Sequence, residues 1–272
     1  MYPGRKFVPP DSPHNQEERV SDDVVFSPDG RIIASSERDH RIILYEAASG
    51  LVRRVLHGHR GELSKVVFSL DGRRLVSFNS DLTGLVWDLS LASGAKGPAT
   101  AEQVRHAWDL LTNRTDGEDV QRSMALLAAS ADAALSLFEK QVRPVPPIDP
   151  RQIARLVGQL DDADFTVRTK ATGELDRLGE DAWLLLCEHQ KKSLPLEAAR
   201  RLGRLVEKHD PMQPSEKRLR ELRALEILEQ FAQPRASKLL AELAKGAPSS
   251  RLTRDAAGAL ERLHRHAAAD QR

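Results

Sequence analysis

The sequence predicts a multi-domain protein in which an all-β part precedes an all-α part. A 42-residue repeat fills the first third of the chain, and beyond residue 100 the apolar residues change from a period of two to about 3.6. A Gly, Ala and Pro-rich stretch separates the two parts. We expect an irregular N-terminal segment over 1–19, a β part over 20–94, a linker over 95–100, a helical hairpin over 101–143, a Pro-rich linker over 144–149, a helical domain over 150–266 and a frayed C-terminus over 267–272.

The repeat is a duplicated structural unit. Phe26–Arg31 recurs as Phe68–Arg73, and Tyr45 with its following Glu recurs as Trp87 with its following Asp. β-rich runs alternate with turns in which Pro, Asp and Gly suit tight reversals. The predicted strands are Val24–Phe26, Ile32–Ser35, Ile42–Tyr45, Leu51–Leu56, Val66–Phe68, Leu75–Ser77 and Leu85–Trp87. The second copy lacks a fourth strand, so seven strands are expected, one short of two four-stranded sheets.

On these motifs the β part resembles blades of a WD-repeat (WD40) β-propeller, whose period is 40–45 residues with Gly-His and Trp-Asp signatures. The fold expected is an incomplete β-propeller of about two blades, because a propeller needs about four or more. The resemblance implies a buried hydrogen-bond chain of His59, Ser77, Asp81 and Trp87, in which Asp81 accepts from the His59 ring.

The same Ser, His and Asp residues could instead form a hydrolase triad. However, they fall at positions inside the repeat, and no Gly-x-Ser-x-Gly elbow surrounds Ser77. We therefore favour a structural role for them. The first copy departs from the pattern, because Tyr45 stands where the second copy has Trp87.

Within the helical part, Asp149 and Pro150 mark the start of one helix, because they form an N-cap followed by proline at the first helical position. Short amphipathic segments follow, and two helices are expected between residues 104 and 142. The turn after Leu160 resembles that of a HEAT-type repeat, which gives the expectation of a HEAT-like helical array. The resemblance implies that Asp164 and Arg168 bridge neighbouring repeats. An ordinary helix start, with acidic residues favoured by the helix dipole, explains the same residues equally well.

Nothing in the sequence carries catalytic chemistry. The chain has no phosphate-binding glycine loop, and its histidine pairs lack zinc-site spacing, so we expect no catalytic, cofactor-binding or metal-binding residues and no cofactor. The net charge of +1 argues against a nucleic-acid partner, and no apolar run is long enough for a membrane helix. Cys187 is the only cysteine, which favours a reducing compartment and a cytoplasmic location.

The sequence therefore leaves two main hypotheses for the function. The first is a non-enzymatic scaffold that binds protein partners, with homo-oligomers as one way to complete the propeller. The second is the C-terminal fragment of a larger regulatory or enzymatic protein whose activity lies upstream, since the order of domains resembles the end of large bacterial WD-repeat proteins. A lyase hidden in the helical part lacks any acid, base or cofactor ligand.

Overall fold

The protein is described by a computed structural model that covers residues 23–37, 39–91, 99–210, 213–231 and 233–269. Residues 266–269 are described by their backbone alone. It divides into two compact units, residues 1–130 and 131–272. The expected segment 1–19, most of the linker 95–100 and the last three residues lie outside the described residues.

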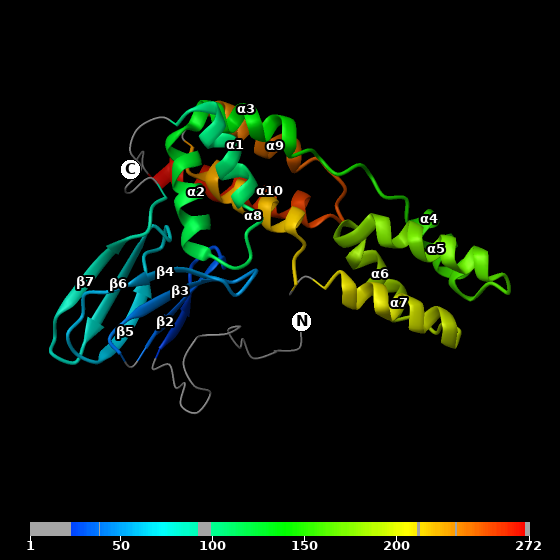
Figure 1. Ribbon diagram of the computed structural model, residues 1–272, viewed down its shortest axis with the longest axis horizontal. Helices are drawn as coiled ribbons and strands as arrows, with labels where there is room; N and C mark the ends of the chain where they lie inside the picture. The colour runs from blue at the N-terminus through cyan, green and yellow to red at the C-terminus, as the bar shows by residue number, and fades with distance from the viewer. Residues whose placement is uncertain (1–22, 38, 92–98, 211–212, 232, 270–272) are drawn as a thin grey trace. The chain divides into compact units, whose positions relative to one another are not determined.

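The first unit contains two antiparallel sheets, as predicted (Figure 1). The first sheet has the strand order β1-β2-β3-β4 and the second β5-β6-β7. The strands are β1 (Val24–Phe26), β2 (Ile32–Ser36), β3 (Ile42–Glu46), β4 (Val52–Leu56), β5 (Leu63–Phe68), β6 (Arg74–Asn79) and β7 (Gly84–Asp88). The arrangement is that of two propeller blades, the second without its outermost strand in the described residues.

The repeated turns explain why the two copies fold alike. Ser27 Oγ donates to Asp29 Oδ1 at 2.6 Å, and Ser69 Oγ donates to Asp71 Oδ1 at 2.5 Å. The glycine that follows each Asp has a φ near 70°, a conformation that suits glycine. The same hydrogen bonds and the same glycine therefore reverse the chain between the first two strands of each sheet.

One face of the first sheet packs on one face of the second. The shared core is apolar and buried, and it contains Ala34, Ile42, Leu44, Leu56, Leu63, Val66 and Leu75. Two polar contacts join the sheets: Asp23 Oδ2 accepts from Val66 N at 2.9 Å, and Arg54 Nη1 donates to Asp88 O at 2.9 Å. The sheets therefore stack as neighbouring blades.

Two helices belong to the same unit, α1 (Ala101–Leu110) and α2 (Gly117–Ala129). Helix α2 packs on β4 (Figure 1). The contact is close because a Cβ at Gly117 would lie 1.5 Å from Val52 O, so only glycine fits there. Beside it the buried Arg53 pairs with Glu46 at 2.7 Å and donates from Nε to Gln121 at 3.2 Å.

The region 101–143 is not the two-helix hairpin expected from the sequence. It holds three helices, because the chain leaves helical geometry at Ser130 (φ −111°, ψ 47°). The boundary between the units falls there, and α3 (Ala131–Gln141) belongs to the second unit. Residues 142–149 form no helix or strand, as expected of the Pro-rich linker, and Val145 O accepts from Ala247 N at 2.9 Å.

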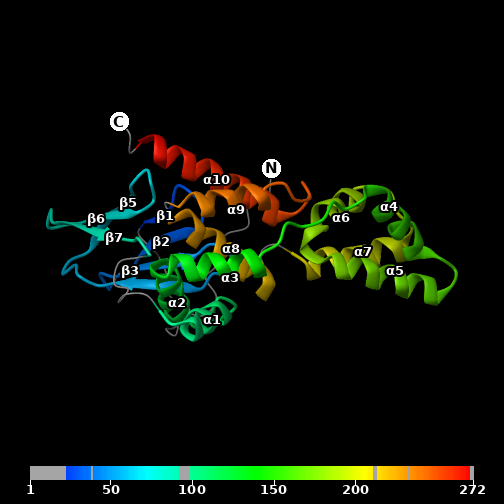
Figure 2. The same cartoon turned by 90° about the horizontal axis from the view of Figure 1, so that it is seen from above.

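Helices α4 to α7 of the second unit gather around one apolar core (Figure 2). They are α4 (Pro150–Gly158), α5 (Phe165–Leu178), α6 (Trp183–Gln190) and α7 (Leu196–Lys208), with 3-10 turns η1 (Gln159–Asp161) and η2 (Gly179–Asp181). Asp149 caps α4 as the sequence indicated. In α7 the buried residues are Ala198, Leu202 and Leu205. Leu196, at the start of α7, is exposed.

The remaining helices are α8 (Glu216–Glu229), α9 (Pro234–Leu243) and α10 (Arg251–Ala269). Helix α10 packs on both α8 and α9. Helix α9 also contacts α3, where Arg235 pairs with Glu139 and donates to Ser136 at 3.1 Å. The backbone of α10 stays helical to Ala269, so the C-terminal segment 267–272 begins inside a helix.

Candidate interaction surface on the second sheet

Three of the four residues expected in the blade hydrogen-bond chain lie together in the second sheet. Trp87 Nε1 donates to Ser77 Oγ at 2.8 Å, and His59 Nε2 lies 2.6 Å from the same oxygen. The His59 and Trp87 rings are 6.2 Å apart between centroids. Ser77 is fully buried on β6, so it links the start of the repeat to the last strand of the sheet.

The close packing around residue 58 explains why a glycine precedes His59. A Cβ at this position would lie 3.0 Å from Leu85 Cδ1 and 3.0 Å from Trp87 Cη2. The missing side chain lets the chain run over the Trp87 ring and places His59 beside Ser77.

Asp81 does not accept a hydrogen bond from His59, which corrects the expectation. Its Oδ1 accepts from Thr83 N at 2.8 Å within the β6–β7 turn, and His59 Nδ1 has no hydrogen-bond partner among the described residues. Hydrogen bonding to Thr83 lowers the pKa of Asp81. Burial lowers the pKa of His59, and the Asp81 charge opposes that shift, so the two residues interact through charge alone.

This geometry argues against a hydrolase triad. Ser77 has no exposed surface and is engaged by Trp87, and the acidic member does not contact the histidine. In the first copy the equivalent residues are arranged differently. Ser35 Oγ donates to Glu37 Oε1 at 3.2 Å, and Asp39 pairs with Arg41.

The second sheet has two unlike faces. The covered face carries Val66, Leu75, Ser77, Leu85 and Trp87 and packs toward the first sheet. The open face is defined by the alternate residues of the same strands: it carries the apolar group Val67, Val76, Phe78, Gly84 and Val86 and also the exposed charged residues Lys65, Arg74 and Asp88.

The large apolar side chains of the open face are exposed. Val67, Phe78 and Val86 are 44%, 45% and 67% exposed. The Phe78 ring lies over Gly84, because a Cβ there would be 3.0 Å from Phe78 Cε1. Exposed large apolar residues that adjoin on one face mark interaction surfaces more often than isolated ones do.

The two candidate residues in the helical unit make local contacts. Asp164 caps α5 by accepting from Thr166 N at 2.7 Å. Arg168 donates to Asp162 O at 2.6 Å and stacks on the Phe165 ring at 5.6 Å. These contacts match the ordinary helix start, and the expected bridge to a neighbouring repeat is not made by the described contacts of either residue.

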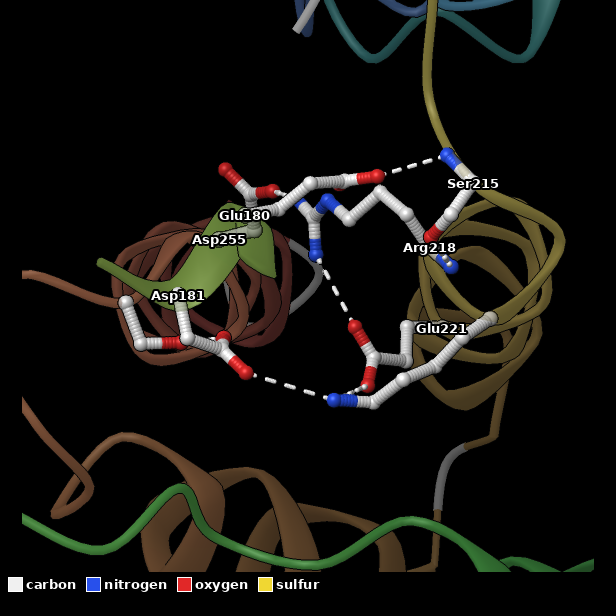
Figure 3. A network of polar contacts seen from close by, with 8 residues as sticks. Glu180, Asp181, Ser215, Arg218, Glu221 and Asp255 are labelled. Carbon is white, nitrogen blue, oxygen red and sulfur yellow. Dashed lines mark hydrogen bonds and ion pairs between the residues drawn. The ribbon is translucent and has the colours of Figure 1, made fainter. Parts of the chain in front are cut away.

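A polar network that the sequence did not indicate ties η2 to α8 and α10 (Figure 3). The buried Arg218 on α8 pairs with Glu221 at 3.5 Å and with Asp255 on α10. Burial lowers the pKa of Arg218 and raises that of Glu221, and their mutual attraction opposes both shifts.

The same network reaches η2 through two acidic residues. Glu180 Oε1 accepts from Ser215 N at 2.6 Å, and Asp181 Oδ1 accepts from Ser250 Oγ at 2.8 Å. Lys217 Nζ lies 3.3 Å from Asp181 Oδ2. Each of these contacts joins two groups of the chain itself, so we regard the network as a structural joint.

Sheet pairing, turn geometry and the Trp87 hydrogen bond together define WD40-type repeats. The WD40 family model, described as WD domain, G-beta repeat, matches residues 13–46 and 50–88. Two relatives called Nuclear distribution protein PAC1, from Arthroderma benhamiae and Trichophyton verrucosum, are each 36% identical over 64 residues. Each alignment covers 24% of this chain and 14% of the relative.

The chain therefore carries two WD40 repeats followed by a helical part. The chain spans about one seventh of the length of these relatives, 14% of each. Both relatives are fungal, so they lend no support to the bacterial origin that the domain order suggested. Within the described ranges no helix is long and apolar enough to cross a membrane, and no three acidic, histidine or cysteine side chains group as a metal site.

Proposed function

We propose that this chain is a non-enzymatic protein-interaction scaffold whose docking surface is the open face of the second sheet. The open face supports the proposal because the repeat allows it to be compared with the equivalent face of the first sheet. Val25 and Leu44 in the first sheet lie 42 residues before Val67 and Val86. Their face of the first sheet is covered by the second sheet, whereas the open face has no such cover among the described residues.

The repeat also defines the partner. The first sheet is covered by a sheet that presents Val66, Leu75 and Trp87, so a partner for the open face is a blade-like sheet with a similar apolar face. Ile33 and Tyr45 form the corresponding face of the first sheet, and both are buried within the chain. A ring of copies stacked face to face is therefore disfavoured, and the partner is a blade of another polypeptide.

Binding rather than catalysis is also the general role of WD40 repeats, whose sheets present rigid surfaces. The helical unit supplies a second rigid body, and we propose that it is a HEAT-like array. We place the protein in the cytoplasm, supported by the single free thiol of Cys187, whose pKa is raised by burial.

Capture from the source cells with two matched variants tests the proposal. Val67→Glu puts a charge in the open face, whereas Leu70→Glu puts the same charge in a turn of the same sheet at a residue 98% exposed. We expect a specific set of proteins to bind the native chain and the Leu70 variant and to be lost with the Val67 variant. Recovery of the same proteins by all three chains, or of none above background, would contradict the proposal.

A second candidate function is that of the C-terminal fragment of a longer regulatory or enzymatic protein. It is favoured by the second sheet, which has three strands among the described residues, and by the short alignment with the relatives. In that case the blade over the open face belongs to the same polypeptide. The intact mass of the native protein decides between the two, since a mass of 30.2 kDa supports the scaffold and a larger mass supports the fragment.

A further inference from the structure

Helices α4 to α7, with η1 and η2, form a lobe (residues 150–208) that has an apolar core of its own. Among the described residues, the buried side chains of this core and the apolar side chains packed against it all come from residues 148–206. None of them belongs to α8, α9 or α10. Because the lobe buries its apolar side chains internally, it does not need the last three helices to complete its core.

Polar contacts of η2 tie this lobe to α8 and α10, and Figure 3 shows the contact with the start of α8. Glu180 Oε1 accepts from Ser215 N, the N-cap of α8, at 2.6 Å. Asp181 Oδ1 accepts from the hydroxyl of Ser250, which directly precedes α10, at 2.8 Å. Two carboxylates therefore lie at the N-terminal ends of two helices, where the helix dipole favours negative charge and salt weakens the attraction.

Two further contacts of the same joint also depend on charge. Lys217 Nζ lies 3.3 Å from Asp181 Oδ2, and the Lys217 side chain is 68% exposed, so water and dissolved ions screen this pair. Burial alone would lower the pKa of Lys217, but the charges of Glu221 and Asp181 outweigh it and raise that pKa. The Arg251 guanidinium lies over the Trp183 ring, 5.4 Å from its centroid. A rise in ionic strength therefore weakens several contacts of the joint together.

The closed joint also leaves buried polar atoms unsatisfied. Glu180 Oε2 and Arg218 Nε are buried and have no hydrogen-bond partner among the described residues. A buried polar atom without a partner is unfavourable, because it has given up its hydrogen bonds to water. Separation of η2 from α8 would return Glu180 Oε2 to water, and this gain offsets part of what the joint loses on opening.

The Pro-rich linker provides a pivot for such a movement. Val145 O accepts from Ala247 N at 2.9 Å, which fixes residue 145 to the turn between α9 and α10. Ile148 packs on the core of the lobe. Only Pro146 and Pro147 lie between these two anchors, and both are exposed. Because proline has no backbone N–H, a rotation at these residues breaks no hydrogen bond that they donate.

We propose that the lobe is hinged at Pro146 and Pro147, and that the contacts of η2 with α8 and α10 are a salt-sensitive latch that holds it closed. This inference goes beyond the proposed function. Its residues all belong to the second unit and none belongs to the open face, so the latch and the docking surface can each fail in their own tests without the other.

Distances between two spin labels test the latch on the full chain. In a Cys187→Ser background, Arg204→Cys and Glu242→Cys place one label on the exposed surface of α7 and one on that of α9. We expect pulsed electron paramagnetic resonance to give one main distance at about 0.1 M salt. A second distance should grow towards about 1 M salt, since the Debye length falls from about 10 Å to about 3 Å.

One pair of matched variants separates the latch from a general effect of charge. Asp181→Asn keeps an oxygen that can accept from Ser250 but removes the charge that faces Lys217. It is expected to raise the ratio of the second distance to the first roughly two- to fivefold at low salt, as loss of an exposed ion pair does. Asp176→Asn removes the same charge from a pair with Lys208 inside the lobe, and should leave the ratio unchanged.

A label pair within the lobe, Arg155→Cys with Arg204→Cys, distinguishes hinge opening from unfolding. The hinge predicts that this distance stays constant with salt and in both variants. If it broadens as much as the distance to α9, the lobe itself comes apart and the hinge is overturned. One distance to α9 that persists at every salt concentration, in the native chain and in the Asp181 variant alike, would also overturn the proposal.

Discussion

Trp87 Nε1 donates a hydrogen bond to Ser77 Oγ at 2.8 Å, and this bond fixes β7 to the interior of the second sheet. His59 Nε2 shares the same oxygen. Replacement of Ser77 by Ala removes the hydrogen bonds of two partly buried ring nitrogens, His59 Nε2 and Trp87 Nε1, which costs about 1–3 kcal/mol. We expect the Ser77→Ala variant to lose that much free energy of unfolding in urea.

The matched control is Ser35→Ala, at the equivalent position of the first copy. Ser35 Oγ has one side-chain partner, Glu37 at 3.2 Å. Its loss is expected to cost clearly less than the loss of Ser77. Equal losses at the two positions would show that the hydrogen bonds to Trp87 and His59 add nothing to stability.

The stability of the first unit is expected to depend on the protonation of His59. Burial holds the pKa of this imidazole below its ordinary 6.5, with the Asp81 charge raising it and His40 lowering it. The unfolded chain therefore binds a proton more readily than the folded chain. Stability from neutral His59 is present above pH 6.5 and is lost as the pH falls through the lower folded value.

Urea unfolding of the native chain and of His59→Gln, measured at neutral and mildly acidic pH, checks this sign. The free-energy difference between the two chains should shift against the native chain as the pH falls. A difference that stays constant with pH would mean that His59 titrates normally in the fold.

Gly117 is expected to be indispensable for seating α2 on β4. Alanine there would bring a Cβ within 1.5 Å of Val52 O, a backbone atom that cannot swing aside. Overpacking of this kind costs about 1–3 kcal/mol. Thermal unfolding of Gly117→Ala should show a clear loss of stability.

Gly173 in α5 provides the comparison, because a Cβ there meets nothing within 4 Å. Gly173→Ala is expected to leave stability unchanged or to raise it by about 0.5–1 kcal/mol. A Gly117 variant as stable as the Gly173 variant would contradict the close packing of helix on strand.

Arg218 is expected to be the most sensitive charge of the second unit. Its removal would leave Glu221 buried with Lys217 alone and would separate α8 from Asp255. Breaking a buried pair costs about 3–5 kcal/mol. Arg218→Ala should therefore unfold the second unit at much lower denaturant, followed through the fluorescence of Trp183.

Arg201→Ala removes the same kind of side chain from a pair within one helix, with the half-exposed Glu197. Such pairs contribute little because water screens them. If both arginine variants unfold at the same denaturant concentration, the network around η2 is not a structural joint.

The β part was predictable in detail because local chemistry specifies it. The Asp-Gly turns and the 42-residue period determine seven strands, and Ser77, His59 and Trp87 come together as the resemblance implied. The partner of Asp81 was predicted wrongly because an Asp in a turn often accepts a hydrogen bond from a nearby backbone N–H. Here that donor is Thr83 N. The sequence holds no signal that distinguishes those two partners.

The helical part was less predictable because its key features depend on tertiary packing. The break at Ser130 lies in an alanine-rich run without Gly or Pro, so three helices looked like two. Arg218 and Glu221 are buried although charged residues in a helix usually indicate an exposed face. For the packing of α2 on β4, the sequence contains one signal, the glycine at residue 117.

The most direct measurement of the central claim is hydroxyl-radical footprinting of the native assembly purified from cells against the isolated chain. We expect Phe78 on the open face to be labelled much less in the assembly and the turn residue Leu70 to be labelled equally in both samples. Equal labelling of Phe78 in the two samples would show that the open face is not where this protein binds its partner.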